Sequence, residues 1–409
     1  MNKLEQLIDE LCPDGVEYKK IKDISKKITS GGTPKTDINS YYGGDIPWLR
    51  TQEIDFGDIP DTGIKITQQG LDNSSAKWIP KNCVIIAMYG ATVGKVGINK
   101  IPMTTNQACC NIDVDTNQAL YRYVFYFLWS KYEYIKSLGQ GSQTNINAQI
   151  VKEIVIPIPP LPVQEEIVRI LDTFTELTTE LTTELTMRKQ QYEYYHNSLF
   201  DFKDKSIKYL SVGELFEIKN GLNKEKDAFG HGQPIINFTD VYKNRWLTNE
   251  KFSGLVDVNS DEIERYSAKK GDVFFTRTSE TKEDIGMSCT LIEDIPNCVF
   301  SGFVLRARPI TDLLLPKFSA YYFSTNEARK TIIRYASFTT RATTTGPKLS
   351  KILVPIPSLE EQQRIVDILD RFDTLVNDIK EGLPAEIEAR KQQYEYYRDK
   401  LLTFKKLEK

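Results

Sequence analysis

The sequence predicts a mixed α/β (α+β) protein in which two similar globular blocks are joined by two long helices that form an antiparallel coiled coil. Three observations lead to this prediction. The eight residues Arg188–Tyr195 recur unchanged at Arg390–Tyr397. The segment Glu153–Pro159 returns in similar form at Lys351–Pro357, 198 positions later. Each of the two related segments is followed by a long stretch with heptad-like spacing of apolar residues. The duplication therefore predicts a pseudo-twofold arrangement, and proteins of that kind commonly bind two-part partners such as DNA.

Composition places the chain among ordinary globular proteins. It has 409 residues, of which 40% are apolar and 27% charged, enough for two or more cores. No stretch approaches the roughly 20 apolar residues needed to span a bilayer, and the N-terminus lacks a signal-peptide pattern, so we expect a cytoplasmic protein without a membrane partner. The six cysteines form no Cys-x-x-Cys pair and only two histidines are present, which makes a metal site improbable.

The first block begins with a short amphipathic helix over Leu4–Leu11, closed by Pro13–Gly15. From Ile21 to Val155 the pattern is mixed and rich in strands. Val84–Met88 is a short apolar run typical of a buried strand, and Ala119–Ile135 is a helix dense in aromatic residues.

The second block, about Ile207–Val354, repeats the same order. The matching segments are Ile46–Ile54 with Gln233–Val241, Lys81–Ala87 with Lys270–Thr276, and the aromatic helix with Leu313–Tyr335. Scaffold positions match while the intervening polar positions differ, so one fold would present two different surfaces. The predicted segments are block 1 at 1–158, helix 1 at 159–205, block 2 at 206–356 and helix 2 at 357–409.

Both long helices carry a heptad seam. Helix 1 places Leu171, Phe174, Thr178, Leu181, Leu185, Arg188, Tyr192, Tyr195, Leu199 and Phe202 on it. Helix 2 runs from Leu369 to Phe404 with four extra residues around Gly382–Pro384, which indicates a stutter or a local break. We expect the two seams to pack against each other; two independent dimerisation tails are the less economical alternative, because both helices lie in one chain.

Helix 1 also contains three copies of a four-residue unit, Thr-Glu-Leu-Thr, over Thr175–Thr186. Each unit adds about 6 Å of helix, compared with roughly 3.4 Å per base pair of DNA. If the helix separates two DNA-reading blocks, one unit changes the gap by about one to two base pairs. A low-complexity solvated helix is the competing interpretation.

No motif predicts an active site. Gly90–Val96 is similar to a phosphate-binding loop, but only three residues separate its glycines, and Val96 stands where Ser or Thr would bind magnesium. The segment is interpreted as a turn. No glycine-rich cofactor loop stands out, and nucleophile–histidine pairs are nearly excluded. The chain is therefore expected to have no catalytic residues and to be a binding scaffold.

The chain resembles the DNA-specificity subunits of type I restriction–modification systems over nearly its whole length. The most specific segments are Gly44–Ile54, Met88–Val96, Gly141–Asn147 leading into Ile156–Pro159, and the two Arg-Lys-Gln-Gln-Tyr segments. The Thr-Glu-Leu-Thr units are similar to short tandem repeats in the central helix of some members. Block 2 departs from the pattern at Thr278–Asp284, the counterpart of the Gly-Ala-Thr loop, so residues are carried over less securely there.

The resemblance implies a non-catalytic subunit whose blocks are target-recognition domains, each reading one half of a split site in double-stranded DNA. The helices would act as spacer and as platform for two methyltransferase subunits, to which motor-nuclease restriction subunits add. S-adenosylmethionine, ATP and magnesium would belong to those partners and none would be bound by this chain. The methylated base would be adenine at N6, flipped from the stack.

Side-chain chemistry selects candidate residues for these roles. Base reading needs bidentate or amide side chains on loops, which Arg50, Gln52, Gln143, Asn145 and Asn147 offer in block 1 and Asn237, Thr239, Arg277, Lys282 and Arg341 in block 2. Phosphate contacts are assigned to Lys95, Lys348 and Lys351, the last two within a segment, 328–359, that has six basic residues and no carboxylate. Partner proteins are expected on Arg188, Tyr194, Arg390 and Tyr396. Solvated loops or structural hydrogen bonds are the alternative for each position.

Two other functions remain open at this point. The same fold could serve a related system in which methyltransferase and nuclease form one polypeptide. A coiled-coil assembly protein that never binds DNA is the second alternative, and it requires that substituting Arg341 and its basic neighbours leave DNA affinity and its salt dependence unchanged.

Overall fold

The computed structural model describes residues 3–139, 145–202, 207–251, 254–378 and 381–408. These residues form two compact units. Unit 1 comprises 1–182 and 386–409, and unit 2 comprises 183–385. Each unit therefore combines one globular block with parts of two long helices, and the predicted boundaries at 158, 205 and 356, which count the helices separately, stay a prediction.

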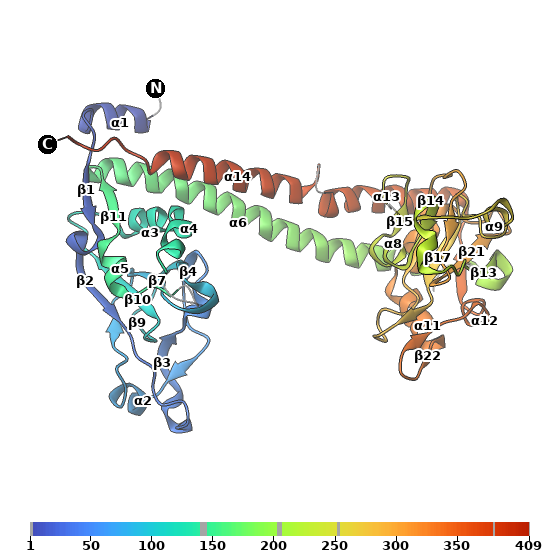
Figure 1. The fold of residues 1–409 in the computed structure, drawn as a ribbon, viewed down its shortest axis with the longest axis horizontal. Coiled ribbons are helices and arrows are strands. Elements are labelled where there is room, and N and C mark those ends of the chain that lie inside the picture. Colours follow the sequence, from blue (N-terminus) through green and yellow to red (C-terminus); the bar gives the residue numbers. More distant parts are fainter. Residues whose placement is uncertain (1–2, 140–144, 203–206, 252–253, 379–380, 409) are drawn as a thin grey trace. The chain divides into compact units, whose positions relative to one another are not determined.

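Unit 1 is an α/β block with helices packed beside its sheets (Figure 1). Its strands are β1 (Glu17–Lys20), β2 (Ser25–Ser30), β3 (Tyr42–Leu49), β4 (Gly57–Ile59), β5 (Lys65–Ile66), β6 (Trp78–Ile79), β7 (Val84–Ala87), β8 (Val96–Asn99), β9 (Met103–Thr105), β10 (Cys109–Val114) and β11 (Val155–Ile158). Its helices are α1 (Lys3–Leu11), α2 (Gln68–Asp72), α3 (Tyr121–Ser130), α4 (Tyr132–Ser137), α5 (Ala148–Glu153), the first part of α6 (Leu161–Ser198) and most of α14 (Leu383–Leu401).

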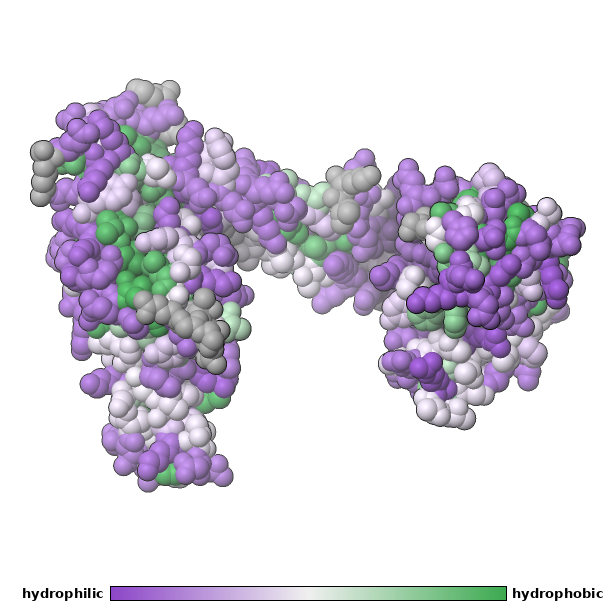
Figure 2. All heavy atoms as spheres, viewed as in Figure 1, coloured by the Kyte–Doolittle hydropathy of each residue, from purple (hydrophilic) through white to green (hydrophobic). Residues whose placement is uncertain are grey.

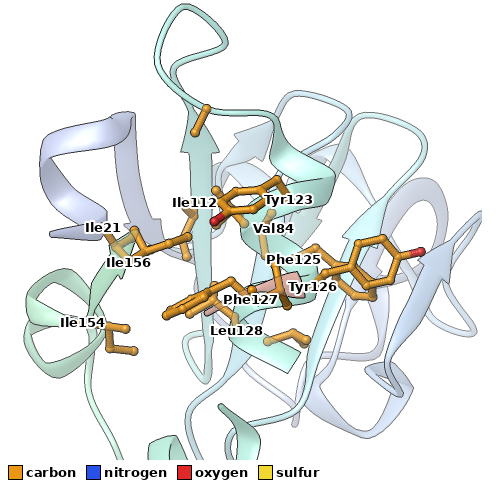
Figure 3. Packing of buried hydrophobic residues seen from close by; sticks show 14 of the residues in the cluster. Ile21, Val84, Ile112, Tyr123, Phe125, Tyr126, Phe127, Leu128, Ile154 and Ile156 are labelled. Atoms are coloured by element: carbon orange, nitrogen blue, oxygen red, sulfur yellow. The ribbon is translucent and has the colours of Figure 1, made fainter. Parts of the chain in front are cut away.

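The main sheet of unit 1 has the strand order β2-β10-β7-β8-β4, and a second sheet has the order β5-β3-β9-β6. The strand β7 is buried at every position, as its unbroken apolar sequence requires. Figure 3 shows how aromatic residues of α3, including Tyr123 and Phe127, pack with Val84 and Ile112 of this sheet and with Ile156 of β11. The buried residues of α3 thus contact both the main sheet and β11, the strand that precedes α6.

Unit 2 repeats this architecture. Its strands are β12 (Lys208–Ser211), β13 (Phe216–Asn220), β14 (Phe229–Ile236), β15 (Trp246–Leu247), β16 (Leu255–Val256), β17 (Val273–Thr276), β18 (Thr278–Ser279), β19 (Ser288–Leu291), β20 (Val299–Phe300), β21 (Val304–Pro309), β22 (Ser337–Phe338), β23 (Ala342–Thr343) and β24 (Leu353–Ile356). Its helices are α7 (Val212–Leu215), α8 (Phe238–Lys243), α9 (Ser260–Arg265), α10 (Pro316–Phe323), α11 (Asn326–Tyr335), α12 (Gly346–Leu349), α13 (Leu359–Asn377) and the rest of α6.

The sheets confirm that the two units share a fold. The five-stranded sheet of unit 2 has the order β13-β21-β17-β19-β15, which matches the main sheet of unit 1 strand for strand. The pairs β1–β11 and β12–β24 are also equivalent, with Tyr18 opposite Pro157 and Tyr209 opposite Pro355. Pairing registers then make Val84 the counterpart of Val273 and Ile28 the counterpart of Ile218.

The predicted antiparallel helix pair is present in both units. In unit 1 the C-terminal end of α14 lies beside the N-terminal start of α6 (Figure 1), and the rings of Phe174 and Tyr397 stack at 5.6 Å. In unit 2 the equivalent contact joins Phe372 of α13 to Tyr195 of α6, also at 5.6 Å. Block 1 therefore packs with the segment Arg390–Tyr397, which follows block 2 in sequence. Block 2 packs with Arg188–Tyr195, which follows block 1.

Two helices differ from the sequence-based expectation. The aromatic helix of each block is divided, because α3 stops at Ser130 before α4, and Thr325 caps the start of α11 by accepting a hydrogen bond from the Ala328 amide. Helix 2 ends as α13 at Asn377 and resumes as α14 at Leu383, which is the break that the extra residues indicated, whereas α6 is continuous.

The first strand and the last residues of the chain pair within unit 1. The Val16 amide donates to the Lys405 carbonyl, and the Leu407 amide donates to the Val16 carbonyl, both at 2.9 Å. In unit 2, residues 203–206, which join α6 to β12, lie outside the described residues, so this pairing is described for unit 1 alone.

Candidate nucleic-acid interface

In unit 1 the candidate base-reading residues lie on adjoining loops. Gln52 belongs to a 3-10 turn, Thr51–Glu53, and Arg50 is its N-cap residue. This turn follows β3 and packs against the Gly90–Thr92 turn after β7. The segment containing Asn145 joins them, because the amide of Ile146 donates to the Met88 carbonyl at 3.0 Å. The structure therefore brings together residues from three distant parts of the sequence.

Two polar atoms on these loops are buried without a partner. They are Nε of Arg50, which lies 3.9 Å from Glu53, and Oδ1 of Asn145. An unpaired buried donor or acceptor costs free energy, so such atoms are often found where a ligand completes the hydrogen bonding. The Arg50 Nε is a donor and suits an acceptor on a base edge or a phosphate, whereas the Asn145 Oδ1 is an acceptor and suits an amino group on a base edge.

The remaining candidates of unit 1 have structural duties. Lys95 forms a 2.7 Å ion pair with Asp55 and lies 5.7 Å from the Phe56 ring centroid, which holds it beside the Gly90–Thr92 turn. Asn147 caps α5 by accepting the Ile150 amide at 3.0 Å. Gln143 lies outside the described residues.

Unit 2 has loops at the equivalent positions, with different side chains. The Thr344 amide donates to the Arg277 carbonyl at 3.0 Å, as Ile146 does to Met88 in unit 1. The strands β18, β23 and β22 form a small sheet at this place. It carries Arg341, whose side chain is 67% exposed, and Phe338, whose ring lies 5.4 Å from the Lys282 ammonium. A weak contact of 3.7 Å between Arg341 and the exposed Glu280 leaves this guanidinium available to a ligand.

Asn237 and Thr239 occupy the positions of Arg50 and Gln52. Asn237 is the N-cap of α8, and its amide donates to Asp240 at 2.8 Å, as the amide of Arg50 donates to Glu53 at 3.3 Å. Burial raises the pKa of Asp240, although the bond from Asn237 acts in the opposite direction. Thr239 is exposed on the first turn of α8.

The basic residues of segment 328–359 do not form one surface. Lys348 bonds to Ser337 next to the small sheet, whereas Lys351 lines a separate groove with Lys330 and Arg334. Arg329 is structural: its guanidinium donates to the carbonyls of Glu283, Ile285 and Gly286 at 2.9, 2.7 and 2.5 Å. The expectation of a single phosphate-facing surface is corrected on this point, because three of the five N–H donors of Arg329 bind carbonyls of its own block.

Replacing Arg329 with alanine is expected to lower the free energy of unfolding by about 3 kcal/mol, because three carbonyls lose a charged donor. Urea denaturation of the purified chain measures this loss. Lys330→Ala, on the next position of the same helix, is the matched control and should change stability by less than about 0.5 kcal/mol. Equal stability of both variants would contradict the structural role of Arg329.

Of the candidate partner residues, the two tyrosines are exposed on the helices and the two arginines are half-buried. Tyr194 and Tyr396 are 68% and 64% exposed, while their neighbours on the seam, Tyr192 and Tyr394, are both 7% exposed. Arg188 contacts Glu184 and Gln191, and Arg390 contacts Glu386 and Gln393 in the same pattern. The two copies therefore offer matching aromatic and basic surfaces.

Residues joining each block to its long helix were missed by sequence reasoning. Asp172 and Asp370 accept hydrogen bonds from α3 and α10, and Gln164 and Gln362 are completely buried at the helix starts. A signal was available, since each pair is separated by the same 198 positions as the two Ile-Pro segments. These positions look like ordinary polar helix positions until the blocks are placed beside the helix.

Other kinds of site were also considered. In the part of the chain that the structure describes, no helix has both the length and the apolar character needed to cross a membrane. Among the same residues, no three His, Cys, Asp or Glu side chains gather as metal ligands would. The visible surface of the units is mostly hydrophilic, with an apolar patch over the part of unit 1 that holds β11 and α5 (Figure 2).

Two equivalent units with different side chains on the same loops define a protein built for two-part recognition. Comparison with known proteins gives the family. Residues 13–188 and 205–389 match the type I restriction modification DNA specificity domain. The chain belongs to this family.

Individual relatives agree. The chain is 34% identical over 310 residues to the type I restriction enzyme EcoR124I/EcoR124II specificity subunit of Escherichia coli, covering 72% of this chain and 73% of that protein. It is 34% identical over 416 residues to a putative type I restriction enzyme specificity subunit, S.HindORF215P, of Haemophilus influenzae, covering 95% and 96%.

Solved structures share the fold. A chain from a structural study of the assembly of a type I restriction–modification system aligns with a TM-score of 0.64 at 19% identity, covering 96% of this chain and 98% of that one. The HsdS subunit from Thermoanaerobacter tengcongensis aligns with a TM-score of 0.54 at 16% identity, covering 96% and 97%.

Proposed function

We propose that this chain is the non-catalytic subunit that selects the DNA target of a cytoplasmic type I restriction–modification complex. Unit 1 reads one half of a split double-stranded site and unit 2 reads the other. The paired helices set the gap and dock two methyltransferase subunits, to which restriction subunits add. Adenosylmethionine, ATP and magnesium serve those partners.

One observation carries the proposal: the two units have the same fold and place loops at equivalent positions, but these loops carry different side chains. Arg50 and Gln52 stand where unit 2 has Asn237 and Thr239, and the position of Met88 is taken by Arg277. A duplicated fold with divergent loops is suited to reading two unlike sequences, because the scaffold positions the loops while their side chains choose the bases.

The role of each residue follows from its chemistry. Arg50, Gln52, Asn145, Asn237, Arg277 and Arg341 are proposed to read base edges, with Gln143, Asn147, Thr239 and Lys282 on the same or adjacent segments. Lys95, Lys348 and Lys351 are proposed to contact phosphates. The exposed Tyr194 and Tyr396, with Arg188 and Arg390, are proposed to contact the methyltransferase subunits.

Methylome sequencing tests the proposal. The chain is expressed together with its methyltransferase subunit in a host without other adenine methylation. We expect N6-methyladenine within a single two-part motif with a fixed gap. Arg341→Ala should reduce methylation of that motif about tenfold or more and relax the half read by unit 2 alone, since a lost base contact is worth about 1–3 kcal/mol.

Lys269→Ala, which removes an exposed lysine outside the candidate DNA-binding segments, is the matched control and should leave the methylome unchanged. If the wild-type chain produces no two-part methylated motif, the proposed function is wrong. If Arg341→Ala relaxes both halves equally, the assignment of one half-site to each unit is wrong.

A further inference from the structure

Each long helix is joined to its block at its first turn by a completely buried glutamine. Oε1 of Gln164 accepts the Leu120 amide at 2.9 Å, and its Nε2 donates to the Pro159 carbonyl at 2.8 Å. In unit 2, Gln362 makes the same two bonds with Leu315 and Pro357, at 2.9 and 3.0 Å. Both helices therefore have a fixed starting point.

Eight residues further on, an aspartate joins each helix to its block a second time. Asp172 accepts from Nη2 of Arg122 at 2.6 Å and from the Tyr126 hydroxyl at 2.5 Å. Asp370 of unit 2 accepts from Nζ of Lys317 at 2.6 Å and from the Tyr321 hydroxyl at 2.7 Å. The four donors come from α3 and α10, the buried aromatic helices of the two blocks.

The spacing of the two joints has a mechanical consequence. Eight residues correspond to about 12 Å along a helix. A helix held at one point can pivot about it, whereas a helix held at two points about 12 Å apart has a fixed direction. The glutamine sets where the helix starts, and the aspartate sets where it points.

The tyrosine donors are well suited to a permanent joint. Tyr126 is completely buried, and its hydroxyl points away from the other labelled residues of the core cluster (Figure 3). Burial first, and then the bond to Asp172, raise the pKa of Tyr126, and burial and Asp370 do the same for Tyr321. Both hydroxyls consequently stay protonated and remain hydrogen-bond donors over the whole physiological pH range.

Building on the proposed function, we propose that Asp172 and Asp370 are positioning residues that restrict the gap between the two halves of the DNA target. Each fixes the direction in which the spacer helix leaves its own recognition block. The length of the helices would set the mean gap, and the two aspartates would set how strictly that gap is kept. Neither residue is proposed to touch DNA or a partner subunit.

The two units provide a built-in comparison. The basic donor is arginine in unit 1 and lysine in unit 2, at equivalent positions of α3 and α10, and both bond to the aspartate at 2.6 Å. Either donor therefore satisfies the joint, while the aspartate and the tyrosine are the same in both units. Arg122→Lys and Lys317→Arg exchange the basic donors of the two units, and each aspartate keeps a basic donor.

The experiment uses the complex of the full-length chain with its methyltransferase subunits. DNA targets carry the native half-sites at the native gap, one base pair shorter and one base pair longer, and methylation rates are measured on each. We expect the combined Asp172→Ala and Asp370→Ala variant to lower the preference for the native gap about tenfold, which corresponds to loss of about one charge-assisted hydrogen bond. The bases required in each half-site should stay the same.

Other variants keep the test decisive if the double alanine variant is unstable. Tyr126→Phe with Tyr321→Phe removes one donor per joint and should lower the preference in the same direction by a smaller factor. Arg122→Lys should preserve the preference. Asp367 is exposed on α13, and in the described structure its carboxylate bonds only to Gln363. Asp367→Ala should therefore also preserve the preference for the native gap.

An unchanged gap preference in the aspartate and tyrosine variants would overturn the inference, as would an equal loss of rate at all three gaps, which indicates a purely structural role. Failure of the proposed function gives a different result, because the wild-type complex would then methylate none of the targets.

Discussion

Grafting the reading part of unit 2 onto unit 1 is expected to convert a target with two unlike halves into an inverted repeat of one half-site. Pairing registers make residues 216–345 the counterpart of 26–147, so this exchange keeps α1, β1, β11 and both long helices in place. Because the base-reading loops all lie within the exchanged part, both units would carry the same loops. The antiparallel helix pairing predicts the inverted orientation.

The contacts of the block with the helices decide how the graft is built. In unit 1 the Arg398 guanidinium of α14 lies 5.9 Å from the Trp129 ring centroid. In unit 2 the position of Trp129 is taken by Ser324, which contacts His196. Unit 2 also has Arg245 at the position of Gly57. The grafted copy should therefore carry two substitutions. Ser324→Trp restores the indole ring that Arg398 contacts, and Arg245→Gly removes a guanidinium that would lie near Arg398.

Methylome sequencing of cells expressing the grafted chain with its partners measures the outcome. A motif in which both halves equal the half-site of unit 2 is the expected result, and the matched control is the same graft without the two substitutions, which should fold less stably. Retention of the original two unlike halves would show that the exchanged loops do not read DNA.

Adding one Thr-Glu-Leu-Thr unit to α6 is expected to move methylation to targets whose gap is longer by about one to two base pairs, since four residues lengthen a helix by about 6 Å. The repeat lies inside the continuous helix, and its threonine hydroxyls bond back to carbonyls four residues earlier, as Thr178 does to Phe174. An extra unit therefore continues an existing helical pattern. On the other side of the pair, α13 ends at Asn377 and α14 begins at Leu383, so the partner of α6 is formed by two helices.

Methylation of a gap-width library by the variant and wild-type complexes measures the shift. Both half-sites should stay the same, and deleting one unit should shift the preference in the opposite direction. The control substitutes Thr179, Thr182 and Thr183 with alanine at unchanged length, and should keep the native gap. A change in the bases that are read, instead of in their separation, would contradict the spacer role of the helix.

Much of the architecture follows from sequence because duplication makes each half a check on the other. The seam positions Leu171 and Leu369 are completely buried, as the heptad spacing predicts. The strand Val84–Ala87 is buried along its whole length, as its unbroken apolar run requires, and so is its counterpart Val273–Thr276, which is apolar up to its last residue. These predictions succeed because they depend on periodicity alone.

Other features could not be predicted because they depend on which distant residues meet. The two Arg-Lys-Gln-Gln-Tyr segments are identical, so sequence gives no sign that each packs on the block that does not precede it. Arg329 is one of the six basic residues of segment 328–359, and its charge is visible in sequence, whereas its three carbonyl partners are backbone atoms that the sequence does not reveal. The same holds for Asp172 and Asp370. The sequence shows a carboxylate on a helix, but the side chains that donate hydrogen bonds to it are known only from the structure.

Two backbone hydrogen bonds of 2.9 Å join Val16, just before β1, to Lys405 and Leu407 in the segment that follows α14. Segments from opposite parts of the sequence thus hold each other within unit 1. Local opening of either segment removes hydrogen-bond partners of the other, so we expect the two to open together in hydrogen exchange.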